Sequence, residues 1–348
     1  MWSNPLMHRA DKAVLRLTLG LGLSVLITYG LALPQPHLSC LVVILLLCKP
    51  GPPLSPIKGL LMGGVLMGLM ASGVLMVPLL EHYGASALML IALILFGLFY
   101  LGLKSGNPLL TLLVITFTLV PVAGVADQAL AFMVIQALAT GVMLGAFIGT
   151  VSHNLFPDEP SQGAKPAYLS PENASWVALR AVIIVLPILV LALQDPSHYL
   201  AAIMKTVALS QQACTTNARN AGKELIGSTL VGALVAAIAW SGLALWPNLW
   251  MLMLWVMATS LWLGVRLFRI KTSRVAPSFW VNALMTMMIL LGPAIQDSAN
   301  GKDVLQASLF RLGLFLLVAC YAWGAVWVLE RWRAGRHLPH TINHETMS

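Results

Sequence analysis

Long apolar segments separated by short polar ones make up most of the chain. Proline, glycine or charged residues bound twelve of them: 13–33, 37–48, 57–80, 85–103, 108–126, 129–152, 176–194, 197–212, 225–245, 248–265, 275–292 and 304–329. Unbroken apolar runs are typical of transmembrane helices, whereas the strands of a membrane barrel alternate apolar and polar residues. The pattern predicts an all-α integral membrane protein of about twelve transmembrane helices. Segments 37–48 and 197–212 are shorter than the ~20 residues that cross a bilayer, so each either thins the membrane locally or is a broken or re-entrant segment.

The composition supports the same class. Hydrophobic residues are 59% of the chain and charged residues 9%, whereas soluble domains carry roughly 25% charged residues. This excludes a soluble enzyme, a nucleic-acid-binding protein and a disulfide scaffold. The four cysteines lie on or beside the apolar segments without CxxC spacing, so we expect buried free thiols, no metal and no cofactor.

The basic residues predict the orientation. With a cytoplasmic N-terminus, the outer loops hold only Lys302, and fifteen basic residues lie in cytoplasmic segments: Arg9, Lys12, Lys49, Lys58, Lys104, Lys165, Arg219, Lys223, Arg266, Arg269, Lys271, Arg274, Arg331, Arg333 and Arg336. Such a bias follows the positive-inside rule. We therefore expect both termini in the cytoplasm, and we interpret most of the net charge of +8 as an orientation signal.

An internal repeat divides the chain into two halves. The pair Leu15-Arg16 recurs as Leu179-Arg180, 164 positions later, and two glycines of the third segment recur in the ninth at the same offset (Gly63 and Gly68, Gly227 and Gly232). Because six spans are an even number, both copies enter the membrane from the same side, and the repeats are parallel. The predicted organisation is a first six-helix repeat (1–152), a cytoplasmic linker (153–175), a second repeat (176–330) and a cytoplasmic tail (331–348).

Four basic side chains are predicted inside the membrane: Arg16, Arg180, Lys205 and Arg311. A charge at that depth costs about 2.5 kcal/mol or more, so each is a candidate for function. Arg16 and Arg180 lie about a turn inside the cytoplasmic face, where snorkelling to the headgroups is the alternative. Lys205 stands near the middle of a short segment, and we expect it to face a cavity.

Arg311 lies about two turns inside the outer face. It either pairs with Asp297, Asp303 or Gln136 or faces inward as an anion site. Together with Arg219, which follows the eighth segment in a polar stretch that we interpret as an inner vestibule, the buried cations favour an anionic solute.

Three residues at the outer ends are candidates for proton coupling: His37, Asp195 and His198. Histidine changes charge near physiological pH, which suits it to such a role. The alternative for each is a side chain that simply faces water.

The second half resembles the fusaric acid resistance and aromatic acid exporter family. The features that carry the resemblance are the helix start Ala178-Leu179-Arg180-Ala181, the polar break from Asp195 to Tyr199, the polar turn from Gln211 to Asn220 with Arg219, and the glycine-rich run from Gly227 to Gly232. A fainter version in the first half comprises Arg16, Lys58 and the run from Gly63 to Gly68. Larger family members carry a cytoplasmic domain, in whose place this chain has only the 153–175 linker, so it looks like a compact branch.

The resemblance implies a bacterial inner-membrane efflux protein for aromatic carboxylate anions, commonly working beside a periplasmic adaptor of the membrane-fusion type. We therefore expect an exporter of small organic anions and not an enzyme. It acts either as a monomer or as a homo-oligomer. The alternatives are a passive anion channel, a membrane scaffold, or an enzyme built on the H-x4-D pattern of His153 and Asp158.

Overall fold

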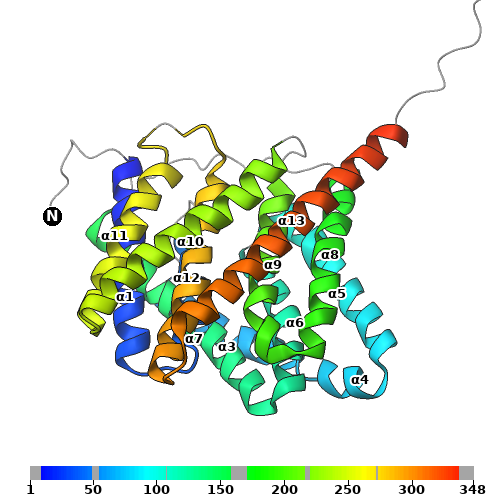
Figure 1. Cartoon of the computed structure of the whole chain (residues 1–348), viewed down its shortest axis with the longest axis horizontal. Helices are drawn as coiled ribbons and strands as arrows, with labels where there is room; N and C mark the ends of the chain where they lie inside the picture. The colour runs from blue at the N-terminus through cyan, green and yellow to red at the C-terminus, as the bar shows by residue number, and fades with distance from the viewer. Residues whose placement is uncertain are drawn as a thin grey trace, which may run out of the picture.

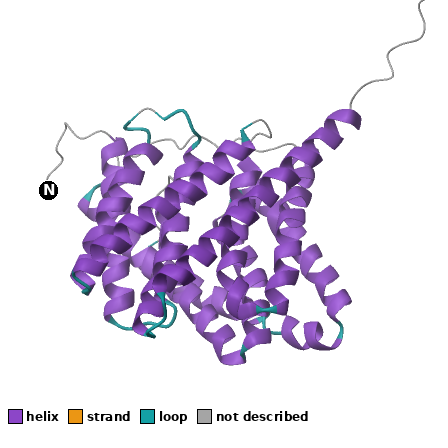
Figure 2. Cartoon of the chain, in the orientation of Figure 1, coloured by secondary structure: helices purple, strands orange, loops and turns teal. Residues whose placement is uncertain are grey.

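Helices form all of the regular secondary structure in the computed structural model, which describes residues 9–48, 55–106, 108–157, 171–215, 220–271 and 273–336 (Figure 2). They are α1 (Arg9–Gly30), α2 (Pro36–Leu47), α3 (Pro56–Ala71), α4 (Met76–His82), α5 (Gly84–Ser105), α6 (Pro108–Ala126), α7 (Gln128–Leu155), α8 (Pro171–Gln194), α9 (Pro196–Thr215), α10 (Ala221–Leu245), α11 (Leu249–Leu267), α12 (Pro277–Ala299) and α13 (Val304–Arg336). Nine segments of the described chain, with α3 and α4 taken as one, are long and apolar enough to span a membrane. The prediction of an all-α membrane protein is confirmed.

The predicted segments match the helices with three corrections. Segment 57–80 is divided into α3 and α4 by turns at residues 72–75, where Gly73 lies against Val120 of α6. Segment 197–212 is longer than predicted, because α9 has 20 residues and a length of about 30 Å. The helices also extend into the predicted linker and tail, since α8 begins at Pro171 and α13 continues to Arg336. In contrast, α2 has only 12 residues and reaches about 18 Å.

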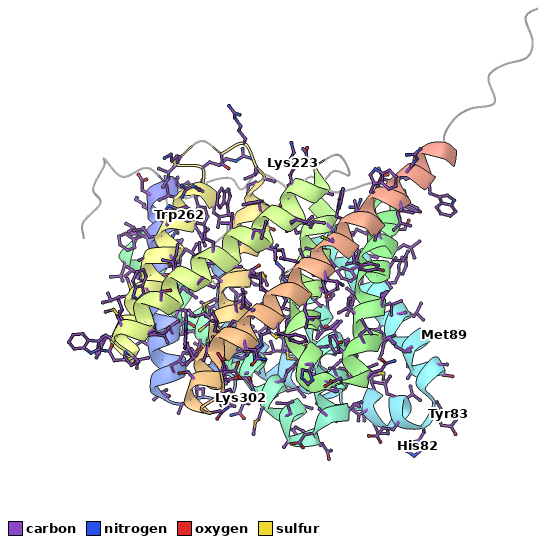
Figure 3. All side chains as sticks on the ribbon, viewed as in Figure 1. His82, Tyr83, Met89, Lys223, Trp262 and Lys302 are labelled. Carbon is purple, nitrogen blue, oxygen red and sulfur yellow. The ribbon has the colours of Figure 1, made fainter. Side chains whose placement is uncertain are left out.

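The helices run between two opposite faces of the bundle. The start of α1 and the end of α13 lie at the same face (Figure 1), and Lys223 and Lys302 lie at opposite faces (Figure 3). The first fact agrees with an even number of crossings in all, and the second with the three helices α10, α11 and α12 that lie between the two lysines. We call the face with the start of α1 the inner face and the face with Lys302 the outer face; which of them is cytoplasmic stays a prediction.

Contacts between helices pair the two predicted halves. α1 packs against α11 and α5 against α8, while α2 packs against α12 and α6 against α9. If α1–α7 and α8–α13 are two copies, the contact of α1 with α11 is equivalent to that of α8 with α5, and the contact of α2 with α12 is equivalent to that of α9 with α6. All four contacts join one half to the other. The arrangement supports the repeat, which stays a prediction.

The centre of the bundle is formed by α12 and the short helix α2. The window of α12 that could span a membrane is 78% buried, compared with 22% for α5, and α2 is buried along most of its length from His37 to Ile44. A helix that is apolar on all sides is stable at the centre of such a bundle, because no face of it has to meet water. α2 and α12 therefore position whatever lies between the halves.

Candidate functional site

A cavity of about 300 Å³ lies between the two predicted halves. Its walls come from α2, α6 and α7 on one side and from α9 and α12 on the other. Leu38, Leu41 and Leu45 of α2 are typical of the first wall, which is almost wholly apolar, whereas Gln212 and Asn282 belong to the second. The cavity is therefore amphipathic, with its polar groups concentrated on one half.

Several polar lining groups lie toward the inner face. Thr111, near the start of α6, donates a hydrogen bond to Oε1 of Gln211 on α9 at 3.4 Å, and both side chains line the cavity. Ser278, in the first turn of α12, also lines it, and its buried hydroxyl makes no hydrogen bond to any described residue. An unpartnered buried hydroxyl is costly unless a ligand or water satisfies it.

Lys205 lies directly behind the polar wall. Its side chain is fully buried on α9, and its Nζ donates to Oδ1 of Asn282 at 3.2 Å and to Oγ1 of Thr286 at 2.6 Å. Both partners belong to α12. The prediction that Lys205 faces a cavity is wrong, because Asn282 lines the cavity and Lys205 does not. The Lys205 side chain reaches the cavity only through that amide.

A chain of hydrogen bonds extends from Asn282 toward the inner face. Nδ2 of Asn282 donates to Oγ of Ser228 on α10 at 2.7 Å, and Ser228 donates to Oε1 of Gln212 at 3.1 Å. Nε2 of Gln212 in turn donates to the backbone carbonyl of Glu224 at 3.0 Å. This network fixes the orientation of two lining amides, those of Asn282 and Gln212.

Helical spacing brings these groups together. Ser278, Asn282 and Thr286 recur every four residues, which places them on one face of α12. On α9, Lys205 and Gln212 are seven residues apart and therefore share a face as well. The polar spacing on α12 is visible in the sequence and is the signal that could have identified Asn282 and Thr286, which sequence analysis missed.

The two repeat-related arginines have protein partners at the inner ends of their halves. Nη1 of Arg16 on α1 donates to Nδ1 of His153 on α7 at 2.7 Å. Arg180 on α8 is buried; it pairs with Glu330 of α13 at 2.7 Å and donates to the backbone carbonyl of Ala213. Each arginine thus ties the first helix of its half to the last. Neither lines the cavity.

Arg311 forms an ion pair with Asp297 of α12 at 2.6 Å. This is one of the pairings that the sequence suggested. The alternative partner Gln136 is wrong, because Gln136 is exposed on α7, and α7 makes no contact with α13.

The three coupling candidates have different environments. His37 is buried at the start of α2, so the alternative of a water-facing side chain is wrong for this residue, and its Nδ1 makes no hydrogen bond among the described residues. Asp195 and His198 form a local pair at 2.7 Å, and both remain substantially exposed at the start of α9. Arg219, the proposed vestibule residue, lies outside the described residues, as does Asp158 of the H-x4-D pattern.

Comparison with known proteins gives a match for the first half alone. Residues 13–151 match the model of a family described as "Protein of unknown function (DUF2955)". That range runs from α1 into α7. No curated protein and no solved structure matches the chain.

Proposed function

We propose that the protein is a transporter that carries small amphipathic organic anions, with aromatic carboxylates as the best-fitting class. The observation that carries this proposal is the cavity between the halves, whose wall on α2 is apolar. The opposite wall, on α9 and α12, adds four polar side chains to its apolar ones: Gln211, Gln212, Ser278 and Asn282. A benzoate-like molecule has the same division between an apolar ring and a charged end. The volume of about 300 Å³ lies at the small end of the range of ligand sites, roughly 300–1,000 Å³.

The charge of the solute is inferred from Lys205. Its two described hydrogen-bond partners, Asn282 and Thr286, are neutral, and no carboxylate among the described residues pairs with it. An ammonium group in so dry a site is costly unless an anion compensates it. A carboxylate that binds at Asn282 would supply that compensation.

Counterflow in proteoliposomes tests this proposal. Vesicles loaded with unlabelled 4-hydroxybenzoate at pH 8 should take up external labelled 4-hydroxybenzoate faster than empty vesicles, because a carrier exchanges solute across the membrane. Ala208 lines the cavity on α9, so Ala208→Trp should fill the site and abolish the acceleration. Ala237→Trp is the matched control, because Ala237 is exposed on α10.

Two results would contradict the proposal. If counterflow is lost equally in Ala208→Trp and Ala237→Trp, transport does not depend on the cavity. Uptake that does not depend on the internal solute, accompanied by an ionic current, would instead indicate a passive anion channel.

The cellular setting is part of the same proposal. We place the protein in a bacterial inner membrane as the exporting component beside a periplasmic adaptor, on the basis of the resemblance to the aromatic acid exporters. Co-purification of an adaptor with the tagged protein from its own membrane tests this partnership.

A further inference from the structure

The outer end of the cavity is closed by a contact between the halves. Leu38 of α2 and Ile289 of α12 are the lining residues nearest to the outer ends of their helices. Immediately beyond them, His37 packs against Gly292: a Cβ added to Gly292 would collide with Cβ and Cγ of His37 and would lie 3.2 Å from its Nδ1. The imidazole therefore rests on bare backbone.

No hydrogen bond holds this contact. His37 is buried, yet its Nδ1 has no partner among the described residues. A buried polar group without a partner gains a hydrogen bond when water reaches it. Separation of His37 from Gly292 therefore brings a compensating gain in hydration.

Two polar contacts keep the outer part of α12 in place. The ion pair between Arg311 and Asp297, at 2.6 Å, anchors it to α13. A weaker hydrogen bond of 3.4 Å runs from Gln296 to Gln35, just before α2. Both lie within five residues of Gly292 along α12, beyond the cavity.

A proline lies at the base of this outer part. Pro293 is inside α12 and has no N–H, so the helical hydrogen bond to the carbonyl of Ile289 cannot form. Proline is one of the few identifiable causes of a helix kink. The missing bond weakens the turn from Ile289 to Pro293, so residues 292–299 of α12 can bend away from the rest of the helix next to the last cavity-lining residue.

We propose that residues 292–299 of α12 are the outer gate of the cavity, closed by the packing of Gly292 on His37 and locked by the ion pair between Asp297 and Arg311. The proposal rests on the proposed transport function for its purpose, because a carrier must open its site to one side at a time. It assigns Arg311 to a gate, not to the binding of substrate.

Thiol accessibility tests the gate without any transport measurement. The reporter is Met285→Cys, a cavity-lining position, in a protein whose four native cysteines are replaced by alanine. Sealed vesicles are used in the orientation in which a separate Lys302→Cys protein reacts with a membrane-impermeant maleimide, since Lys302 lies at the outer face (Figure 3). The reporter should react slowly in these vesicles when the gate is intact.

Two independent changes should open the gate. Gly292→Ala forces His37 away, and the double variant Asp297→Asn/Arg311→Gln removes the lock without leaving an unpaired charge. Because each change removes one of the contacts that hold the gate closed, each should raise the labelling rate by at least about tenfold. Gly313→Ala, which meets open space, and Asp303→Asn, which retains the helix cap, are the matched controls.

The outcomes separate the gate from the transport function. Unchanged labelling in both opened variants, with normal elution on gel filtration, would overturn the gate, as would rapid labelling of the reporter in the parent protein. If one variant does not fold, the other decides. A protein that shows the accelerated labelling but no counterflow would retain the gate and lose the proposed substrate class.

Discussion

Lys205 is the residue that most restricts the chemistry of the cavity. It is fully buried, its described partners are neutral, and they hold it next to a lining amide. The other three intramembrane cations differ, because each contacts a histidine or a carboxylate. Lys205 is thus the basic residue best placed to act on a solute.

Replacing Lys205 separates the role of its charge from that of its hydrogen bonds. Lys205→Met removes both, whereas Lys205→Gln keeps a donor without the charge. We expect the rate of 4-hydroxybenzoate counterflow to fall at least about tenfold in both variants. The free energy of unfolding should change by no more than about 3 kcal/mol, because replacement of buried charged groups by uncharged ones is often tolerated. Full activity in Lys205→Gln would show that the charge is unnecessary.

The sequence predicted correctly those properties of single residues that depend only on their depth in the membrane. The depth of Lys205 in the bundle could be predicted from its place in the middle of an apolar segment, but the prediction that it faces a cavity is wrong, because Asn282 lies between it and the cavity. The partners of Lys205 could not be predicted, because they depend on which face of α12 meets α9. The partner of Arg311 also depends on which helices meet. The sequence could therefore suggest Asp297 as this partner, but it could not exclude Gln136.

At the scale of elements, α2 and α12 combine rigidity with a point of flexibility. α2 is too short to span a bilayer by itself, so it is supported by the helices around it, whereas α12 crosses the bundle and contains Pro293. The sequence identified the short segment 37–48 correctly. It did not reveal the turns between α3 and α4, because Val74 and Leu75 are apolar, and serine and glycine, as at positions 72 and 73, also occur within transmembrane helices.

Pro293→Ala should make α12 more stable and less mobile. Alanine restores the hydrogen bond to Ile289, and a proline inside a helix costs roughly 3 kcal/mol. We expect a higher unfolding temperature together with severalfold slower counterflow. Pro187→Ala in α8, at an exposed helix position, is the control and should raise stability without slowing transport; equal slowing in both variants would contradict a special role for Pro293.

At the scale of the whole molecule, the cavity exists because the two predicted halves meet along α2, α6, α9 and α12. The halves are not equivalent there, since the polar network lies wholly on α9, α10 and α12. The sequence predicted the two halves from the repeat. It could not predict the volume of the cavity or its division into an apolar and a polar wall, which depend on how the helices pack.

Co-expression of the two halves tests this organisation. Fragments 1–157 and 171–348 should associate in the membrane, because the contacts of α1 with α11, α5 with α8, α2 with α12 and α6 with α9 all cross between them. Purification through a tag on the second fragment should recover the first in equal amount. Recovery of the second fragment alone would contradict two halves joined in this way.

Photoaffinity labelling tests most directly whether the cavity binds a small organic anion. The purified protein in lipid is irradiated with 4-azidobenzoate, and the modified residues are identified by mass spectrometry. We predict adducts within residues 38–48, 204–212 and 278–289, removed by excess 4-hydroxybenzoate and absent from Ala208→Trp. Adducts confined to lipid-facing positions of α3, α5 and α13, or adducts in the cavity that 4-hydroxybenzoate does not remove, would contradict the proposed site.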